Sequence, residues 1–355
     1  MLRSMSIFIR KSLTAGVLEM EQTDQYIEYS NHMGLFLNPK VIDAHEGVAL
    51  WRSGGPLTPL SITSSFHKIL RGEIFEGNPF LSIEDQSRLR HHYPLLLAPD
   101  RYPPELVERI YVNRRAPAVQ VILEDKDPMV FDAGCGFGSE SFLFASMGAR
   151  ILAVDISEEQ IQVAKKRQRY FEETLGRPLD VTFSVADLDE YTGDTRNLSL
   201  TWLASVLAAV RDQGTFLAKV YEATRPGGQV MITDMNLFNP LFLIREWYRR
   251  QQAKKENVEF SLHSNFWDMV KRRNRIGAHY FRGNDGSSFD DVQFFSVDTL
   301  SKLLSNVGFT LTPELFSGFV PPHMWQLGLE SLENAFSRFP ILRRFGYFYL
   351  VAGTK

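Results

Sequence analysis

The chain has 355 residues and a formal net charge of -3, with 44% hydrophobic and 23% charged residues. This composition is typical of globular proteins and excludes a disordered or fibrous chain, and the slight negative charge argues against a broad basic surface for nucleic acid. A single cysteine, Cys135, excludes an intrachain disulfide and a cysteine-rich zinc site. No apolar run approaches the roughly 18 residues of a membrane-spanning helix, so we expect a soluble, cytoplasmic protein without a transmembrane segment.

The first 19 residues carry three basic side chains and no acidic side chain before Glu19. Such a composition is typical of a mitochondrial transit peptide, which would place the protein in the matrix. The alternative, which we favour, is a flexible terminus or a start codon that lies upstream of the true one, because Met20 opens an ordinary N-terminal sequence. We therefore expect residues 1–19 to lie outside the fold.

Residues 20–119 mix aromatic side chains with turn signals such as Ser53-Gly54-Gly55-Pro56. This mixture favours short elements over one long helix. The stretch 103–119 begins with two prolines and spaces its apolar residues at helical intervals, so it predicts a helix that leads into the next domain. We expect residues 20–119 to form an N-terminal cap or lid.

From residue 128 onward, short apolar runs alternate with stretches of helical pattern. This alternation predicts βαβ units and a parallel sheet that is covered on both faces. The predicted strands are 129–131, 151–154, 181–185, 198–203, 229–233, 308–312 and 347–352, and the predicted helices are 139–147, 157–175, 213–224 and 297–304.

A glycine-rich segment, Asp132-x-Gly134-x-Gly136-x-Gly138, lies between the first predicted strand and the first predicted helix. Glycines allow a tight turn and let a ligand approach the backbone closely. The free N–H groups of the following helix suit a carboxylate or phosphate. A dinucleotide fingerprint of the form G-x-G-x-x-G would place its third glycine at position 139, which is a serine here, so the spacing argues against NAD.

This pattern resembles motif I of class I S-adenosylmethionine-dependent methyltransferases, and three further positions agree with it. Asp155 ends the second strand 21 positions after Gly134, Asp187 ends the third strand, and Arg225-Pro-Gly-Gly228 precedes the fifth. The resemblance implies a Rossmann-like α/β fold with a doubly wound, seven-stranded, mostly parallel sheet and a mainly helical cap. It implies a core sheet built from residues 120–236, which bind S-adenosyl-L-methionine, and 290–355, with 237–289 as a basic helical cap insertion.

The resemblance also implies roles for individual residues. The three glycines would make room for the methionine part of the cofactor, the carboxylate of Asp132 would reach its amino group, and Asp155 would accept hydrogen bonds from the ribose hydroxyls. We expect Cys135 to pack in the loop, because no basic side chain lies next to it in the sequence to activate a thiolate. The predicted cofactor-binding residues are Asp132, Gly134, Cys135, Gly136, Gly138, Asp155, Ile156, Asp187 and Leu188.

No catalytic base follows from the motifs. Many relatives carry an acidic residue and a histidine after the fourth strand, where this chain has only small and apolar residues at 204–209. Without that acid, Asp234 and Asn236 after the fifth strand favour a structural role, and we expect no metal. The candidate bases outside the core, for each of which a surface or core role is the alternative, are His32, His263, His279 and Tyr280.

The segment 237–282 is the main clue to the acceptor, because it holds ten Lys or Arg residues against four Asp or Glu residues. Its charge would attract a small-molecule acceptor that is anionic or lipid-like, and the alternative is a solvated helix face. No base-methylation or RNA-binding motif occurs, so nucleic acid is not expected. We therefore expect a small-molecule methyltransferase. A non-catalytic cofactor-binding protein and a nicotinamide oxidoreductase are the alternatives, and the acceptor, the methylated atom (O, N or C) and a homodimer are left open.

Overall fold

The computed structural model describes residues 48, 58–93, 104–192, 195–236, 239, 276–277, 293–312, 315–317, 346 and 348–355. Its helices are α3 (Pro59–Glu76), α4 (Ile83–His92), α6 (Pro104–Glu124), α7 (Ser139–Ala145), α8 (Glu158–Leu175), α9 (Gln213–Ala223) and α12 (Val297–Val307), with two 3-10 helices, η1 (Leu188–Glu190) and η2 (Leu207–Ala209). The strands of the main sheet are β1 (Met129–Ala133), β2 (Arg150–Asp155), β3 (Val181–Val185), β4 (Leu198–Ala204), β5 (Thr224–Met235), β8 (Thr310–Leu311), β9 (Leu315–Ser317) and β10 (Phe348–Thr354). A separate pair joins β6 (Ile276–Gly277) to β7 (Gln293–Phe294).

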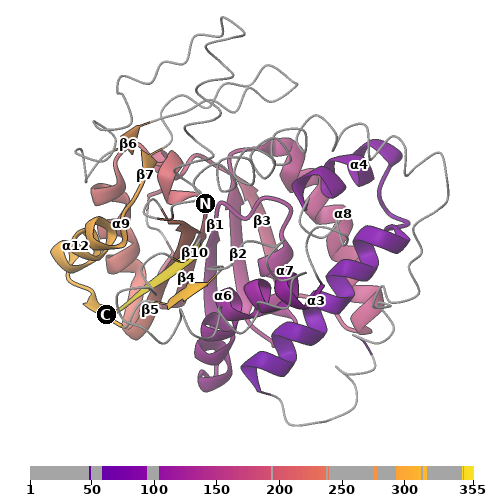
Figure 1. Ribbon diagram of the computed structural model, residues 1–355, viewed down its shortest axis with the longest axis horizontal. Helices are drawn as coiled ribbons and strands as arrows, with labels where there is room; N and C mark the ends of the chain where they lie inside the picture. Colours follow the sequence, from indigo (N-terminus) through magenta and orange to yellow (C-terminus); the bar gives the residue numbers. More distant parts are fainter. Residues whose placement is uncertain are drawn as a thin grey trace, which may run out of the picture.

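The main sheet has the strand order β3-β2-β1-β4-β5-β10-β8, and β9 also pairs with β10 (Figure 1). Strands β1 to β5 run parallel, and β10 runs antiparallel to β5, β8 and β9. The predicted doubly wound, seven-stranded, mostly parallel sheet is confirmed, with β9 as an additional short strand. The strand order reverses between β1 and β4, and open α/β sheets bind their ligands at the carboxyl ends of the strands at such a point.

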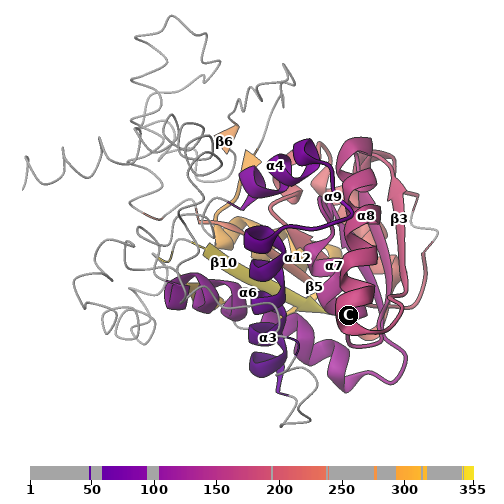
Figure 2. The same cartoon turned by 90° about the vertical axis from the view of Figure 1, so that its right-hand side faces the viewer.

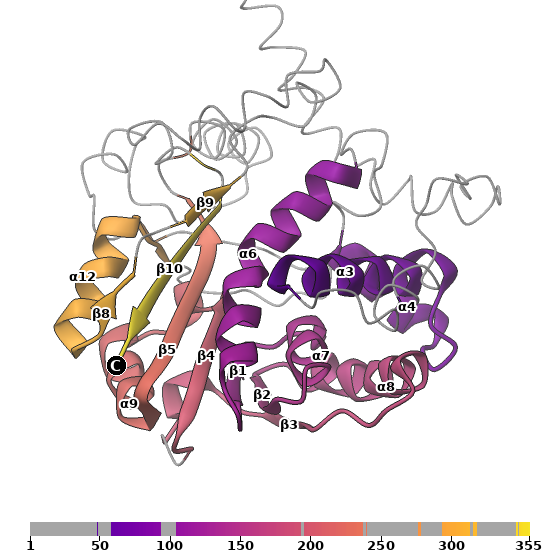
Figure 3. The same ribbon diagram turned by 90° about the horizontal axis from the view of Figure 1, so that it is seen from below.

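Helices cover both faces of this sheet, as the alternation of short apolar runs with helical stretches predicts. Successive side chains of a strand point to opposite faces. On β5, Met231 packs into a core with α3, α6, α7 and α8, whereas Val230 and Ile232 pack into a second core with α9 and α12. Seen from below the view of Figure 1, α6 lies along one face of the sheet while α9 and α12 lie to the other side of β5 and β10 (Figure 3).

Local capping signals set the bounds of the helices that flank the glycine-rich segment 134–138. The Ser157 side chain accepts a hydrogen bond from the backbone N–H of Gln160 and begins α8, and Gly176 ends it in a left-handed conformation. Helix α7 begins after Gly138, which is also left-handed. Both helices lie where the sequence predicts them.

The prediction of short elements in the N-terminal region is wrong for α3, which has 18 residues. Its apolar residues recur at helical spacing, and Phe66, Ile69 and Leu70 are fully buried. This buried stripe packs against α6, so tertiary contact rather than local turn signals decides its length (Figure 2). The predicted helix at 103–119 is confirmed as α6, which continues to Glu124 and so crosses the domain boundary expected at 119/120.

Several expectations concern residues outside the described part of the chain. Residues 1–19 lie there, as do most of the segment 20–57 and most of the basic insertion 237–289, so the expected flexible terminus and helical cap stay predictions. Among the described helices, none is both long enough and apolar enough to cross a membrane.

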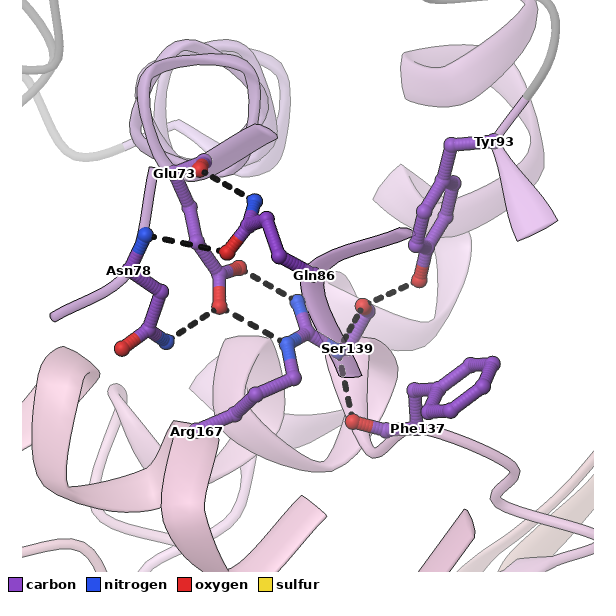
Figure 4. A network of polar contacts seen from close by, with 7 residues as sticks. All are labelled: Glu73, Asn78, Gln86, Tyr93, Phe137, Ser139 and Arg167. Atoms are coloured by element: carbon purple, nitrogen blue, oxygen red, sulfur yellow. Dashed lines mark hydrogen bonds and ion pairs between the residues drawn. The ribbon is translucent and has the colours of Figure 1, made fainter. Parts of the chain in front are cut away.

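A buried ion pair ties the N-terminal helices to the core (Figure 4). Arg167 of α8 donates from Nε and Nη2 to the two carboxylate oxygens of Glu73 in α3, at 2.8 and 2.6 Å, and neither side chain is exposed. Asn78 donates a further hydrogen bond to Glu73 at 2.8 Å. Burial lowers the pKa of the Arg167 guanidinium, but the Glu73 charge outweighs it and holds that pKa above its ordinary value. The Arg167 guanidinium is therefore charged in the folded protein.

Substitution Glu73→Gln would leave the Arg167 charge buried without its counter-charge. We expect the free energy of unfolding, measured by urea denaturation, to fall by about 3–5 kcal/mol. The matched control is Asp127→Asn, which removes an exposed ion pair with Arg150 and should cost about 0–1 kcal/mol. Equal losses for the two variants would contradict this role of the Glu73–Arg167 pair.

A second buried group in the N-terminal layer is His67 of α3. Its ring is fully buried against Tyr111 at a centroid distance of 4.8 Å, and neither ring nitrogen has a hydrogen-bond partner among the described residues. Burial lowers the pKa of His67 well below its ordinary value, and the charges of Arg71, Arg115 and Lys68 lower it further. The folded protein therefore keeps this histidine neutral.

Because only the unfolded chain protonates His67 readily, stability should fall as the pH drops below about 6.5. Asp132 and Asp234, whose pKa values are raised, have the opposite dependence, so the contribution of His67 is isolated by comparing the protein with its His67→Leu variant. Below pH 6.5, we expect the free energy of unfolding of the variant to fall by about 1 kcal/mol less per pH unit than that of the wild-type protein. Urea denaturation between pH 7.5 and 5.5 measures this difference. Parallel pH profiles for the two proteins would refute the prediction.

Candidate active site

The glycine loop turns sharply where β1 ends. The backbone N–H groups of Gly134 and Cys135 both donate to the carbonyl of Val154 on β2, at 2.7 and 3.0 Å, and Gly138 closes the turn with a 2.9 Å bond to Cys135. Gly134, Gly136 and Gly138 have φ values of 72°, 53° and 79°. A Cβ atom at position 134 would lie 2.3 Å from the Val206 side chain, so this glycine is required by both its conformation and its close packing.

Asp155 holds the glycine loop against the end of β2. Its carboxylate oxygens accept hydrogen bonds from the backbone N–H groups of Gly136 and Ser157, each at 2.9 Å. The loop and the first turn of α8 are thus joined through one carboxylate. The structure brings Asp155 and the glycines together, as the sequence predicts.

Asp132 lies below the loop in a buried position. It is 2% exposed, and its carboxyl group accepts a 2.5 Å hydrogen bond from the Ser141 hydroxyl. Burial, together with the nearby charge of Glu140, raises the pKa of Asp132 to about 7. Glu140 itself forms an ion pair with Arg115 of α6. That Asp132 reaches the cofactor amino group stays a prediction.

The remaining predicted cofactor residues lie at the carboxyl ends of β2 and β3. The two ends are neighbours, because the N–H of Ala186 donates to the Asp155 carbonyl at 3.0 Å. Asp187 caps η1 by accepting a 2.9 Å hydrogen bond from the Asp189 N–H, and Leu188 is buried. Ile156, in contrast, leaves 60% of its side chain exposed, which gives this edge an apolar surface that the described residues do not cover.

Cys135 is a free, buried cysteine in the loop. Burial raises the pKa of its thiol above the ordinary value, and the charges of Asp132 and Asp155 act in the same direction. A thiol of this kind is protonated at neutral pH and is a poor nucleophile. Its environment therefore favours the packing role that the sequence suggests.

A cluster of polar residues at the ends of β4 and β5 lies beside the glycine loop. Ser205 has a φ of 55°, which is unusual for a residue other than glycine, and its backbone N–H donates to the Thr233 carbonyl at 2.9 Å. Asp234 follows on β5 and is 5% exposed. Arg114 of α6 donates from Nε to the Thr233 hydroxyl at 2.9 Å and lies 4.4 Å above the Phe348 ring. A half-buried arginine and a buried acid thus both lie at this edge of the sheet.

Sequence reasoning did not identify the residues that support the loop from outside it. Arg167 donates from Nη1 to the Phe137 carbonyl at 2.6 Å and to the Ser139 hydroxyl at 3.0 Å (Figure 4). The Tyr93 hydroxyl contacts the same Ser139 hydroxyl. The only signal for Arg167 is its place on the apolar face of α8, beside Ala164 and Phe171, which does not by itself indicate a buried partner.

The four candidate bases, His32, His263, His279 and Tyr280, lie outside the described residues. Asn236 donates from its amide nitrogen to the Gly346 carbonyl at 2.9 Å, which is a structural contact between β5 and β10. In the part of the chain that the structure describes, no group of three or more His, Cys, Asp or Glu side chains could hold a metal ion.

Comparison with known proteins identifies a protein family that matches the region of the glycine loop. Residues 124–291 match the family model described as a methyltransferase domain. Malonyl-[acyl-carrier protein] O-methyltransferase of Serratia marcescens is 30% identical over 106 residues, which are 30% of this chain and 38% of that protein. Ubiquinone biosynthesis O-methyltransferase of Coxiella burnetii is 27% identical over 117 residues, or 33% and 47%.

Two further matches cover a smaller share of the relative or have a lower sequence identity. Phosphoethanolamine N-methyltransferase 3 of Arabidopsis thaliana is 26% identical over 106 residues, or 30% of this chain and 20% of that protein. A solved S-adenosylmethionine-dependent methyltransferase from Methanosarcina mazei is 17% identical with a TM-score of 0.45, covering 67% of this chain and 97% of that one.

The chain spans less than half the length of each curated relative described above. The matched region, residues 124–291, includes the glycine loop, Asp155 and strands β1 to β5. The family match and the order of the strands agree with each other and with the motifs of the sequence. Residues 124–291 therefore form a methyltransferase domain, and its motifs are those of the class I S-adenosylmethionine-dependent methyltransferases.

Proposed function

We propose that this protein transfers a methyl group from S-adenosyl-L-methionine to a small-molecule acceptor. The observation that carries the proposal is the junction of the glycine loop and Asp155 at the point where the strand order reverses. This point is where open α/β sheets bind ligands. At Gly134 and Gly138 the side chains of Val206 and Phe183 fill the space that a Cβ atom would need, so the tight turn of the loop requires both glycines.

The chemistry of the surrounding side chains fits this cofactor. The Asp155 carboxylate has acceptor capacity beyond its two backbone bonds, because each carboxylate oxygen can accept two hydrogen bonds. That capacity suits two ribose hydroxyls. The exposed Ile156 side chain offers an apolar surface to the adenine ring, with Asp187 and Leu188 at its edge. The glycine loop and Asp132 would hold the methionine part.

Bound S-adenosyl-L-methionine would supply an electrophilic methyl group on a sulfonium. The work of the protein would then be to hold the acceptor atom in line with that methyl group and to exclude water. The loop after β4, which contacts Gly134 through Val206, and the end of β5 form the edge of the sheet next to the glycine loop. We place the acceptor at this edge.

The acceptor atom would be oxygen or nitrogen, with carbon a less favoured choice. The relatives described above include O-methyltransferases and an N-methyltransferase, which supports either atom without choosing between them. The basic segment 237–282 follows β5 directly in sequence and favours an acceptor that carries an anionic group. A cytoplasmic location and a homodimer stay predictions.

A non-catalytic cofactor-binding protein is the second candidate. It is favoured by one observation: residues 204–209 after β4 provide no acid or histidine. A nicotinamide oxidoreductase is disfavoured, because Ser139 stands where the third fingerprint glycine would be and its hydroxyl is bonded to Arg167.

Substitution Asp155→Ala should weaken binding of S-adenosylhomocysteine about 10- to 100-fold in isothermal titration calorimetry, because it removes charge-assisted hydrogen bonds to the ribose. Asp180→Asn is a matched control, since this exposed carboxylate precedes β3 at the opposite end of the sheet. The thermal unfolding of both variants without ligand shows whether the loop itself is intact. Unchanged affinity of Asp155→Ala would mean that this carboxylate does not hold the cofactor.

Catalysis is tested by incubating the protein with methyl-labelled S-adenosyl-L-methionine and a small-molecule extract of its source cells. A methyltransferase should move label into a small-molecule fraction, and heat-treated protein should not. Binding of S-adenosylhomocysteine without any transfer would favour the non-catalytic alternative. Absence of such binding would rule out the proposed function itself.

A further inference from the structure

The ends of three neighbouring strands place a row of residues along the carboxyl edge of the sheet. The register pairs Ala133 of β1 with Leu203 of β4, and Ala204 of β4 with Thr233 of β5. The residues that follow these pairs are Gly134, Ser205 and Asp234. Because adjacent strands are about 4.8 Å apart, Asp234 lies about 10 Å from the glycine loop, a distance that a small acceptor can span.

Asp234 is an unusual residue for this position. Thr233 faces α6, where Arg114 bonds to it, so the next side chain along β5 faces the opposite side of the sheet, with α9 and α12. Asp234 is 5% exposed and accepts a 2.7 Å hydrogen bond from the Met235 N–H. Among the described residues it forms no ion pair. A buried carboxylate that lacks a direct ion pair is costly and marks candidate functional sites.

The surroundings of Asp234 keep it ionised near neutral pH. Burial raises its pKa to about 6, whereas the Met235 N–H, the charge of Arg114 and the Ser205 hydroxyl each lower it. Ser205 reaches this position with a left-handed backbone, and non-glycine residues in that conformation cluster at functional sites. The next residue, Val206, packs against Gly134, so the loop that carries Ser205 contacts both the acid and the glycine loop.

We propose that the Asp234 carboxylate takes the proton that the acceptor loses during methyl transfer, so that the acceptor is a hydroxyl or a neutral amine rather than a carboxylate. The inference rests on the proposed function. The lone pair of the acceptor O or N forms the new bond to the methyl carbon, the carbon–sulfur bond breaks, and its electron pair stays on sulfur. The proton moves to an Asp234 oxygen and passes to water after product release.

Two charged or titratable side chains from neighbouring elements act on Asp234. Arg114 of α6 has a pKa lowered to about 10 by burial, and Tyr349 of β10, which lies opposite Asp234, has a pKa raised well above 10 by burial. Neither group changes its charge between pH 5 and 8. Asp132, beside the glycine loop, has a pKa of about 7, so a change in rate around pH 6 reports Asp234 where loss of the Ser205 hydroxyl moves it.

The test compares the protein with its Asp234→Asn variant at saturating S-adenosyl-L-methionine. Catechol and ethanolamine are the proton-bearing probes, and malonate is the carboxylate probe. We expect methylation of a proton-bearing probe with kcat rising through pH 6, and a loss of about 100-fold or more in kcat at pH 7 in Asp234→Asn, with a smaller change in KM. Asp180→Asn should retain the full rate and the pH profile.

Ser205→Ala separates a proton-accepting role from a structural one, because it keeps the carboxylate but removes a group that lowers its pKa. The midpoint of its pH profile should move upward, which a merely structural Asp234 would not produce. The proposal is overturned if Asp234→Asn retains its kcat, if the Ser205→Ala midpoint does not move, if malonate alone is methylated, or if neither proton-bearing probe is methylated or bound by the S-adenosylhomocysteine complex in calorimetry. Failure of the wild-type protein to bind S-adenosylhomocysteine would instead contradict the proposed function.

Discussion

The arrangement of the glycine loop depends on the buried ion pair between Arg167 and Glu73. A guanidinium without solvent contact requires a counter-charge, and Glu73 is supplied by a helix that lies outside the methyltransferase domain in sequence. The same guanidinium donates to the Phe137 carbonyl and the Ser139 hydroxyl. The N-terminal helices thus support the loop through one side chain, so they belong to the functional unit.

The carboxylates at the edge of the sheet differ in their surroundings from one strand to another. Asp155 at the end of β2 binds backbone N–H groups of the loop and retains capacity for a ligand, whereas Asp234 at the end of β5 is buried beside a strained serine. The two carboxylates therefore differ in environment, as expected of groups with different tasks. We propose that Asp155 holds the cofactor and that Asp234 serves the acceptor, with the glycine loop between them.

Sequence patterns predicted the core closely because its strands and helices are bounded by local signals. Ser157 and Gly176 mark the two ends of α8, and the glycines mark the turn after β1. Long-range contacts carry no such signal. The burial of Arg167 against Glu73, 94 residues away in the chain, and the length of α3, which is set by packing on α6, both depend on tertiary structure that composition and spacing do not encode. For the same reason, the bond from Arg114 to Thr233 did not emerge from the sequence.

The most direct test of the proposed arrangement is a crystal structure of the protein with S-adenosylhomocysteine. Both ribose hydroxyls should lie within hydrogen-bonding distance of the Asp155 carboxylate, the methionine part should follow the loop from Gly134 to Gly138, and the sulfur should face the edge formed by Ser205 and Asp234. A ligand bound elsewhere, or bound in the loop with its sulfur turned away from β4 and β5, would contradict it.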